Sequence, residues 1–273
     1  MISMAGFVQR VGRRASRAAF PVALAVATAA GAQDCPLVTE SAHVAPAGTL
    51  TLETGFDVLR AEPNFITGAP RDVWAGPLLR LTYAPADAAE FDLEWVARVG
   101  QRDDPAFGST SDFGDVTLRA KLRLAEARAS RPALAARLAV TLPQTSFGDG
   151  LGPNTLRFSA QVLLTRAFGR ATFSANAGLA IHDEPLRAHE QRDFLAYGVA
   201  VARRVGTRLE LLGEVAGLLG DGMPGADARS EARLGVRLGA DRLRCDAALR
   251  RGLGDADGTW GLTLGLTRRL RPR

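Results

Sequence analysis

Lysine, histidine, cysteine and aromatic residues are all scarce in this sequence of 273 residues. Lys121 is the only lysine, and the chain has three histidines, two cysteines and 6% aromatic residues. The histidines and cysteines do not form a recognisable metal-ligand cluster in the sequence. We therefore expect no metal ion and no cofactor.

The first part of the chain has the features of an export signal. A positively charged stretch precedes a short apolar run over residues 18–30, and Ala30-Gly31-Ala32 has the form of a signal-peptidase site. We predict a signal peptide over residues 1–32 and a mature chain that begins near Gln33. The positive charge of the signal comes from Arg10, Arg13, Arg14 and Arg17.

The net charge of +5 is concentrated in this predicted signal. Without its four arginines the mature chain carries +1, because the signal contains no acidic residue. Such a balance gives no reason to expect nucleic acid as a partner. Cys35 and Cys245 belong to an exported chain, where a disulfide is allowed, and the sequence leaves their pairing open.

No apolar run as long as a transmembrane helix follows the signal. The sequence alternates instead, most clearly within residues 112–141, where apolar residues between Val116 and Leu124 alternate with charged residues or threonine. A period of two places the two sets on opposite faces of a β-strand. We interpret the apolar face as lipid-facing and the charged face as the lining of a closed barrel.

Twelve alternating segments follow one another from Gly48 onward, with longer polar connections after the odd-numbered segments. Bacterial outer-membrane barrels have an even strand count, short periplasmic turns and longer outer loops. The sequence therefore predicts an all-β fold, a twelve-stranded antiparallel up-and-down transmembrane barrel over residues 48–273. Residues 33–47 are predicted as a periplasmic N-terminal segment, which either hangs free or plugs the barrel. A water-soluble β-sandwich is the alternative fold.

Several stretches resemble a known family. They include residues 77–83 (Pro-Leu-Leu-Arg-Leu-Thr-Tyr), residues 90–93 (Glu-Phe-Asp-Leu) and residues 112–121, which begin Asp-Phe-Gly-Asp. They resemble the outer-membrane β-barrel family named for the MetA pathway of phenol degradation, whose members are often labelled transporters. The resemblance covers roughly residues 74–266. It implies an outer-membrane barrel used for solute passage, and it supplies no catalytic motif.

Charged residues on the predicted inward faces are candidates for lining the lumen and selecting solutes. Opposite charges facing each other across two strands stabilise the pair, which suggests a register for three hairpins. The alternative role is a ladder of salt bridges that fills a narrow barrel. The predicted pairs are Glu94–Arg119, Asp92–Lys121, Glu90–Arg123, Glu210–Arg237, Glu214–Arg233 and Glu231–Arg250. Arg137 and Arg157 lack an obvious acidic partner, so they are the stronger selectivity candidates.

Five aromatic residues are predicted to lie where the barrel wall meets the lipid headgroups. An interfacial girdle, in which amphipathic rings lie at the lipid headgroups, is favoured over a track for aromatic solutes. The girdle candidates are Trp74, Tyr83, Trp95, Tyr197 and Trp260. His182 is the histidine expected on a strand, but Ser174 lies roughly 26 Å away along that strand. We therefore assign no catalytic residue and expect no enzyme.

These features together predict an outer-membrane channel of a Gram-negative-type bacterium. Its function would be passive passage of small solutes, with hydrophobic or aromatic compounds as candidates. The alternatives are a structural or surface-interaction barrel with a plugged lumen, and an enzyme at the lumen or rim. Its expected partners are outer-membrane lipid, the assembly machinery and an unidentified small-molecule solute. Barrels commonly end in an aromatic residue that this machinery reads, whereas Leu270 occupies the outward register here.

Overall fold

The computed structural model describes residues 35–187, 189–240 and 242–270, and every regular element in these ranges is a β-strand. No helix in the described ranges is long and apolar enough to cross a membrane. The predicted signal peptide lies outside the described residues. The strands are β1 (Leu50–Pro63), β2 (Pro70–Ala86), β3 (Ala89–Val96), β4 (Val99–Asp104), β5 (Gly108–Asp112), β6 (Val116–Ala125), β7 (Ala133–Leu142), β8 (Arg157–Phe168), β9 (Ala171–Asp183), β10 (Gln191–Arg204), β11 (Leu209–Leu219), β12 (Arg229–Ala240), β13 (Leu243–Gly252) and β14 (Trp260–Leu270).

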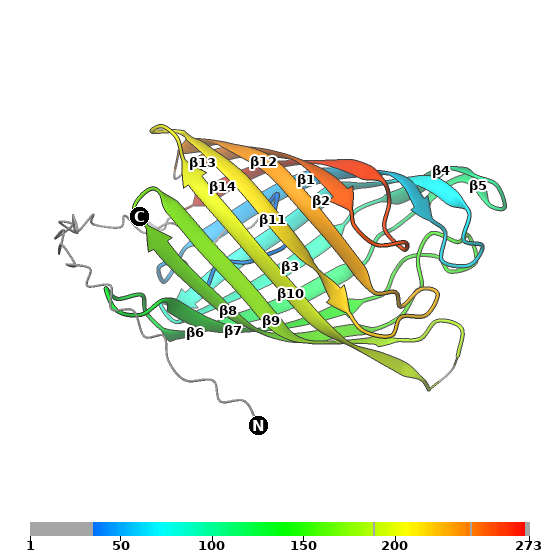
Figure 1. The fold of residues 1–273 in the computed structure, drawn as a ribbon, viewed down its shortest axis with the longest axis horizontal. Coiled ribbons are helices and arrows are strands. Elements are labelled where there is room, and N and C mark those ends of the chain that lie inside the picture. Colours follow the sequence, from blue (N-terminus) through cyan, green and yellow to red (C-terminus); the bar gives the residue numbers. More distant parts are fainter. Residues whose placement is uncertain (1–34, 188, 241, 271–273) are drawn as a thin grey trace, which may run out of the picture.

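These fourteen elements form one closed antiparallel sheet. Strand β1 pairs with β14 on one side and with β2 on the other, so the sheet closes into a barrel (Figure 1). The short β5 pairs with β4 on one side only. Strands β3 and β4 run one after the other along β2, and β5 and β6 continue each other in the same way. Each of these two couples is a single barrel strand with a short break, which confirms the predicted twelve-stranded barrel.

The connections differ between the two ends of the barrel. At the end where β1 begins and β14 finishes, β8 and β9 are joined by two residues, Gly169 and Arg170. At the opposite end the connections include residues 143–156 and 220–228, and Figure 1 shows these longer loops extending beyond the wall. The connection of residues 126–132, at the first of these two ends, is longer than its neighbours there, and it corresponds to the polar turn between the two alternating halves of residues 112–141.

The outward and inward faces have opposite chemistry. Large apolar side chains on the outside are exposed, including Leu234 at 72% and Leu249 at 62%. Polar and charged side chains such as Glu53, Glu214 and Thr267 point inward and are buried. A water-soluble protein would show the reverse arrangement, whereas lipid solvates an apolar outer face. The prediction of an apolar wall around a charged interior is confirmed.

Residues 35–49 do not lie outside the barrel. They run through its lumen, where Thr39, Glu40, Ala42 and Thr49 are each at most 4% exposed. Their contacts reach strands from all sides of the wall, as described below. Residues 35–47 were expected as a periplasmic segment that either hangs free or plugs the barrel. The structure places them within the barrel, in the plugged arrangement. We call residues 35–47 the plug.

Candidate functional site: a charged lumen closed by the N-terminal segment

Backbone groups of the plug donate hydrogen bonds to side chains from widely separated strands. The Val38 amide donates to both carboxylate oxygens of Glu214 in β11, at 2.9 Å each. The Ala42 amide donates to Oγ1 of Thr165 in β8 at 2.9 Å, and the Ala45 amide to Oε2 of Glu90 in β3 at 3.1 Å. An irregular segment inside a barrel needs such partners, because its amides cannot join the sheet.

Side chains of the wall also bind the plug backbone. Arg233 donates from Nη1 to the Pro36 carbonyl at 2.6 Å, and Arg237 donates from Nη2 to the Cys35 carbonyl at 2.9 Å. The Asn176 amide, oriented to satisfy both of its ends, accepts from the Glu40 amide at 2.7 Å and donates to the Glu40 carbonyl at 2.9 Å. Two of the predicted selectivity arginines, Arg233 and Arg237, therefore hold the plug.

Glu40 places the one acidic side chain of the described plug residues among cations of the wall. Its carboxylate pairs with Nη1 of Arg137 in β7 and lies 3.5 Å from Nζ of Lys121 in β6. Lys121 also pairs with Glu90 at 2.8 Å. Burial alone would raise the pKa of Glu40, but Arg137 and Lys121 outweigh it and hold that pKa well below its ordinary value of 4.5. The carboxylate is therefore ionised in the closed state.

Small residues on the inward face of the wall make room for the plug. A Cβ atom at Gly198 in β10 would lie 2.3 Å from Oγ1 of Thr39, and one at Gly265 in β14 would lie 2.3 Å from Sγ of Cys35. Ala42 packs into a buried apolar cluster on the same inner surface. Its other members are Ala133, Ala135 and Leu163. The plug thus has a shape-matched bed as well as charge-matched contacts.

We expect Gly198→Val to displace the plug without unfolding the barrel. The new side chain would overlap Thr39, and overpacking of this kind typically costs about 1–3 kcal/mol. The measurement is the rate at which protease cuts residues 35–47 in the folded, detergent-solubilised protein. Gly213→Val is the matched control, because an outward Cβ there meets nothing closer than 3.5 Å. Equal cutting rates for both variants would contradict the packing argument.

A second layer of the lumen is a compact ion network between β1, β2, β3 and β6. Glu94 accepts from both Arg80 and Arg119, with 2.8 Å to Nε of Arg80 and 3.0 Å to Nη2 of Arg119. Arg119 also pairs with Asp92 at 2.8 Å, and Arg80 reaches Glu53 at 3.5 Å. The side chains of this network are 5–18% exposed. They fill the lumen rather than line an open passage.

The predicted register of β3 against its neighbour is wrong by two residues. The structure pairs Glu90 with Lys121 and Asp92 with Arg119, whereas Glu94 faces Thr117. Arg123 pairs with Glu126 of its own turn instead of Glu90. A shift of two residues keeps every side chain on its face, so charge complementarity alone could not distinguish the two registers.

The other two predicted registers had different outcomes. Strands β11 and β12 pair as predicted, with Glu210 opposite Arg237 and Glu214 opposite Arg233. Strands β12 and β13 are again displaced by two, which places Arg233 opposite Arg250. Glu231 still reaches Nη2 of Arg250 diagonally at 2.8 Å. Long arginine side chains can thus satisfy an ion pair in either register.

Arg137 and Arg157 have acidic partners that sequence reasoning missed. Arg137 pairs with Glu40 of the plug, and Arg157 pairs with Asp115 next to the break between β5 and β6. Neither acid lies on a neighbouring regular strand, so cross-strand pairing could not identify it. The inward residues Arg80 and Asp246 were not among the predicted lumen-lining candidates, although Arg80 alternates with Leu79 and Leu81.

Loop 143–156 narrows the barrel at the end with the longer loops, which we call the outer mouth. The backbone of this loop binds two buried side chains of the wall. Arg71 donates from Nη1 to the Gly150 carbonyl, and Gln101 donates to the Asp149 carbonyl at 3.1 Å. A Cβ at Gly225 would lie within 3.4 Å of side-chain atoms from three other segments of this end, which shows how closely the loops converge. These atoms belong to Phe65, Pro153 and Pro185.

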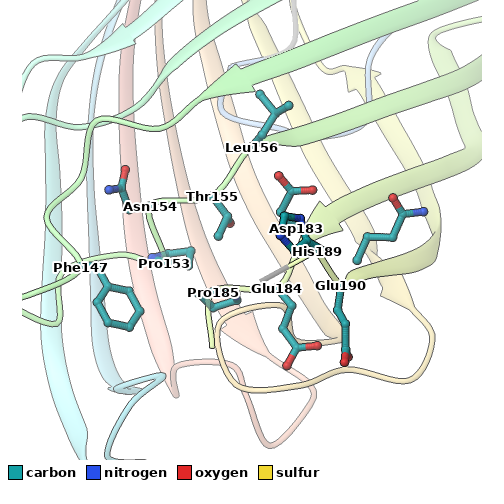
Figure 2. Close-up of a pocket in the computed structure, with 11 residues that line it drawn as sticks. Phe147, Pro153, Asn154, Thr155, Leu156, Asp183, Glu184, Pro185, His189 and Glu190 are labelled. Atoms are coloured by element: carbon teal, nitrogen blue, oxygen red, sulfur yellow. The ribbon is translucent and has the colours of Figure 1, made fainter. Parts of the chain in front are cut away.

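A pocket of about 540 Å³ lies between loop 143–156 and the connection from β9 to β10 (Figure 2). Its lining includes Phe147, Thr155, Glu184, His189 and Glu190. Glu184 pairs with Arg192 of β10 at 3.1 Å, so this carboxylate is already engaged with the wall. Among the described residues, no group of His, Cys, Asp or Glu side chains is arranged to hold a metal ion.

The two residue pairs that the sequence left for catalysis or a disulfide, His182 with Ser174 and Cys35 with Cys245, do not meet in the structure. The ring of His182 packs against Phe194 with centroids 5.2 Å apart, and the Ser174 hydroxyl lies 3.0 Å from that of Thr165. Cys35 and Cys245 are both free. Cys35 is part of the plug and lies inside the lumen against Gly265, where burial raises the pKa of its thiol to about 12. Cys245 is exposed on the outward face, so the two thiols cannot meet across the wall.

The five aromatic girdle candidates all lie on the outward face. Tyr83 is 48% exposed, Trp260 is 51% exposed and Trp95 is 37% exposed. Trp74 stacks on Phe56 with ring centroids 6.3 Å apart, and the Tyr197 hydroxyl donates to Ser230 at 2.9 Å. Their outward orientation excludes a track for solutes inside the lumen. Their role as a girdle stays a prediction.

Residues 34–265 match the profile of the family described as "Putative MetA-pathway of phenol degradation". The chain belongs to this family. The matched range includes the plug together with nearly the whole barrel, so the family pattern extends over both parts of the site. No curated protein matches the chain in sequence.

Two solved structures share the fold of this family member. One is the COG4313 outer membrane channel from Pseudomonas putida F1, with a TM-score of 0.63 and 18% identity over 84% of this chain and 97% of that chain. The other is the β domain of the Bordetella autotransporter BrkA, with a TM-score of 0.51 and 11% identity over 82% of this chain and all of that chain. At these identities the likeness shows the fold, a closed outer-membrane type of barrel.

Proposed function

We propose that this protein is a bacterial outer-membrane channel for passive passage of small hydrophobic or aromatic solutes, with the plug as its gate. The observation that carries the proposal is a polar lumen occupied by a segment that precedes β1 and contacts the wall through hydrogen bonds, ion pairs and packing, without a disulfide. A barrel built solely as a rigid anchor could fill its lumen with wall side chains. Here inward glycines and alanines leave space for a removable peptide.

The location is supported by the wall and by the relatives. The outward face is apolar over the length of the strands, as lipid requires. A closed barrel is the β-architecture that leaves no unpaired backbone group facing hydrocarbon. The similar barrel from Pseudomonas putida F1 is described as an outer membrane channel. An export signal over residues 1–32 would bring the chain to the same membrane.

The second candidate is a structural or surface-interaction barrel with a permanently filled lumen. It is favoured by the density of the ion network around Glu94 and by loop 143–156, which narrows the mouth. The two functions differ in one property. A channel must have an open state, whereas a structural barrel keeps its plug in place under all conditions.

Planar-bilayer conductance with a lockable plug distinguishes these functions. The variant carries Thr39→Cys and Gly198→Cys, whose side chains would be adjacent, in a background where Cys35 and Cys245 are changed to serine. A variant without residues 36–46 serves as the open reference. We expect frequent openings from the reference, more openings from the reduced double-cysteine protein than from the unaltered chain, because a side chain at position 198 crowds residue 39, and none after oxidation.

Three further variants make the result decisive. Each single-cysteine variant controls for the substitutions themselves, because neither can form the bridge. A chain without residues 36–46 and with loop 143–156 shortened tests whether the mouth alone blocks conduction. If this last variant passes neither ions nor solutes in vesicle swelling, the channel function is wrong and the structural barrel is favoured.

A further inference from the structure

The surroundings of the Glu40 side chain have the composition of a carboxylate-binding site. Its oxygens face Arg137 and Lys121, whose side chains are 11% and 4% exposed, and Glu40 itself is 5% exposed. Arginine and lysine are the side chains that bind carboxylates most strongly, through charge-assisted hydrogen bonds. The pKa of Glu40 lies below its ordinary value in spite of burial, so this place stabilises the anionic form of a carboxyl group.

The charge of this place changes when the plug leaves. In the closed state the cations Arg137 and Lys121 are balanced by Glu40 and by Glu90, which pairs with Lys121 at 2.8 Å. Without Glu40, the same wall residues carry one net positive charge. The neighbouring Arg80 and Arg119 are paired with three acids, Glu53, Asp92 and Glu94, so this network adds no positive charge. The net positive charge belongs to Arg137 and Lys121 themselves, and these two side chains match a ligand with a single negative charge.

An apolar surface lies next to this cationic place. Ala135 is two residues from Arg137 on the same inward face of β7, and Leu163 lies opposite Ala135 on β8. Ala133, Ala135 and Leu163 are each at most 1% exposed because Ala42 of the plug covers them. When the plug leaves, this patch is uncovered together with Arg137. A ligand that replaces Glu40 and Ala42 would need one carboxylate and a small apolar body.

We propose that Arg137, Lys121 and the patch of Ala133, Ala135 and Leu163 form a binding site for small apolar monocarboxylates, and that the plug occupies it through Glu40 and Ala42. The inference deepens the proposed channel function and rests on it. Ligand and plug exclude each other because both use Arg137. Since such a ligand binds only the unplugged state, it shifts the equilibrium toward that state and opens its own path.

Benzoate is a suitable probe, and benzyl alcohol is its uncharged counterpart of nearly the same size. The first measurement is the ion current through the chain without residues 36–46, at increasing concentrations of each probe. We expect benzoate to bind in the open lumen and reduce the current of small anions, and benzyl alcohol to have no such effect. The second measurement is plug release from the full chain. It is monitored as the rate at which protease cuts residues 35–47 with and without benzoate.

Three substitutions give a crossed pattern that a merely structural role would not produce. Arg137→Gln should weaken benzoate block of the unplugged chain roughly ten- to a hundredfold, because a hydrogen bond between charged groups is lost. Glu40→Gln in the full chain should let benzoate block the current at a lower concentration than in the unaltered full chain, because the competing carboxylate is gone and the plug no longer occupies the site. Arg229→Gln is the matched control, since Arg229 also points into the lumen but pairs with Glu62 at 2.6 Å.

The outcomes separate this inference from the proposed function. If the unplugged chain conducts but benzoate and benzyl alcohol act alike, the binding site is wrong and the channel stands. Equal effects of Arg137→Gln and Arg229→Gln on benzoate block would also overturn the site. If the unplugged chain with its shortened mouth loop does not conduct at all, the channel function itself fails. Binding of benzoate to that silent barrel, measured by calorimetry and lost in Arg137→Gln, would still support the site.

Discussion

Glu40→Gln should convert a channel that is mostly closed into one that is mostly open. The substitution removes the acid that pairs with Arg137 and leaves a buried guanidinium facing a neutral amide. Breaking a buried ion pair from one side costs about 3–5 kcal/mol, which corresponds to a shift in the plug equilibrium of roughly two to four orders of magnitude. The cost falls on the closed state, because the open lumen hydrates both cations.

Open probability in planar bilayers measures this effect directly. Glu126→Gln is the control, because it removes one negative charge from an exposed side chain in the turn before β7. Only a small change is expected there, since exposed ion pairs contribute about 0–1 kcal/mol. If Glu40→Gln stays as closed as the control, the hydrogen bonds of Glu214 and Thr165 hold the plug without help from the ion pair.

The pKa of Glu40 also sets the direction of the pH dependence. Its pKa is depressed in the closed state, so the ion pair contributes its full stability above the ordinary value of 4.5. That contribution is lost only as the pH falls through the lowered pKa of the closed state. The open probability of the unaltered channel should therefore stay low between neutral pH and 4.5 and rise only at lower pH. The open probability of Glu40→Gln should not show this rise, because its amide cannot take up a proton in this range.

The second large effect is expected at Glu94, which bridges two arginines. Glu94→Gln would leave Arg80 and Arg119 with Glu53 and Asp92 as their remaining acids. Glu94 accepts hydrogen bonds from both arginines, and such charged bonds are worth about 1.5–3 kcal/mol each, so we expect the barrel to lose about 3–5 kcal/mol of stability. The measurement is the midpoint of guanidinium-induced unfolding in lipid vesicles, with the plug deleted in both proteins so that only the wall is tested.

Glu190→Gln in the outer loop is the matched control for this prediction. Its carboxylate is about half exposed and pairs with Arg187 at 3.4 Å, so its loss should cost less than about 1 kcal/mol. An unfolding midpoint for Glu94→Gln that equals the control would mean that water already solvates the network. The lumen would then be more open than the 12% exposure of the Glu94 side chain indicates.

Local chemistry of the sequence was sufficient to predict the wall. The alternation within residues 116–124 assigns each side chain to a face, because strand geometry repeats every two residues. The same period gives the strand count and the inward orientation of Arg119, Lys121 and Arg137. Opposite charges also placed Glu210 against Arg237 correctly. These properties depend on residues that are close in the chain or on adjacent strands.

Only the tertiary structure decided what fills the lumen. Glu40 pairs with Arg137, which lies 97 residues further along the chain. Val38 binds the carboxylate of Glu214, which lies 176 residues further along the chain. No period in the sequence relates an irregular segment to a wall that surrounds it. The registers of β3 and β13 were undetermined for a related reason, since a shift of two preserves both faces and long arginines still reach an acid. The sequence by itself determined a barrel with a charged interior, and the closure of the barrel around residues 35–47 decided that this interior is a plugged lumen.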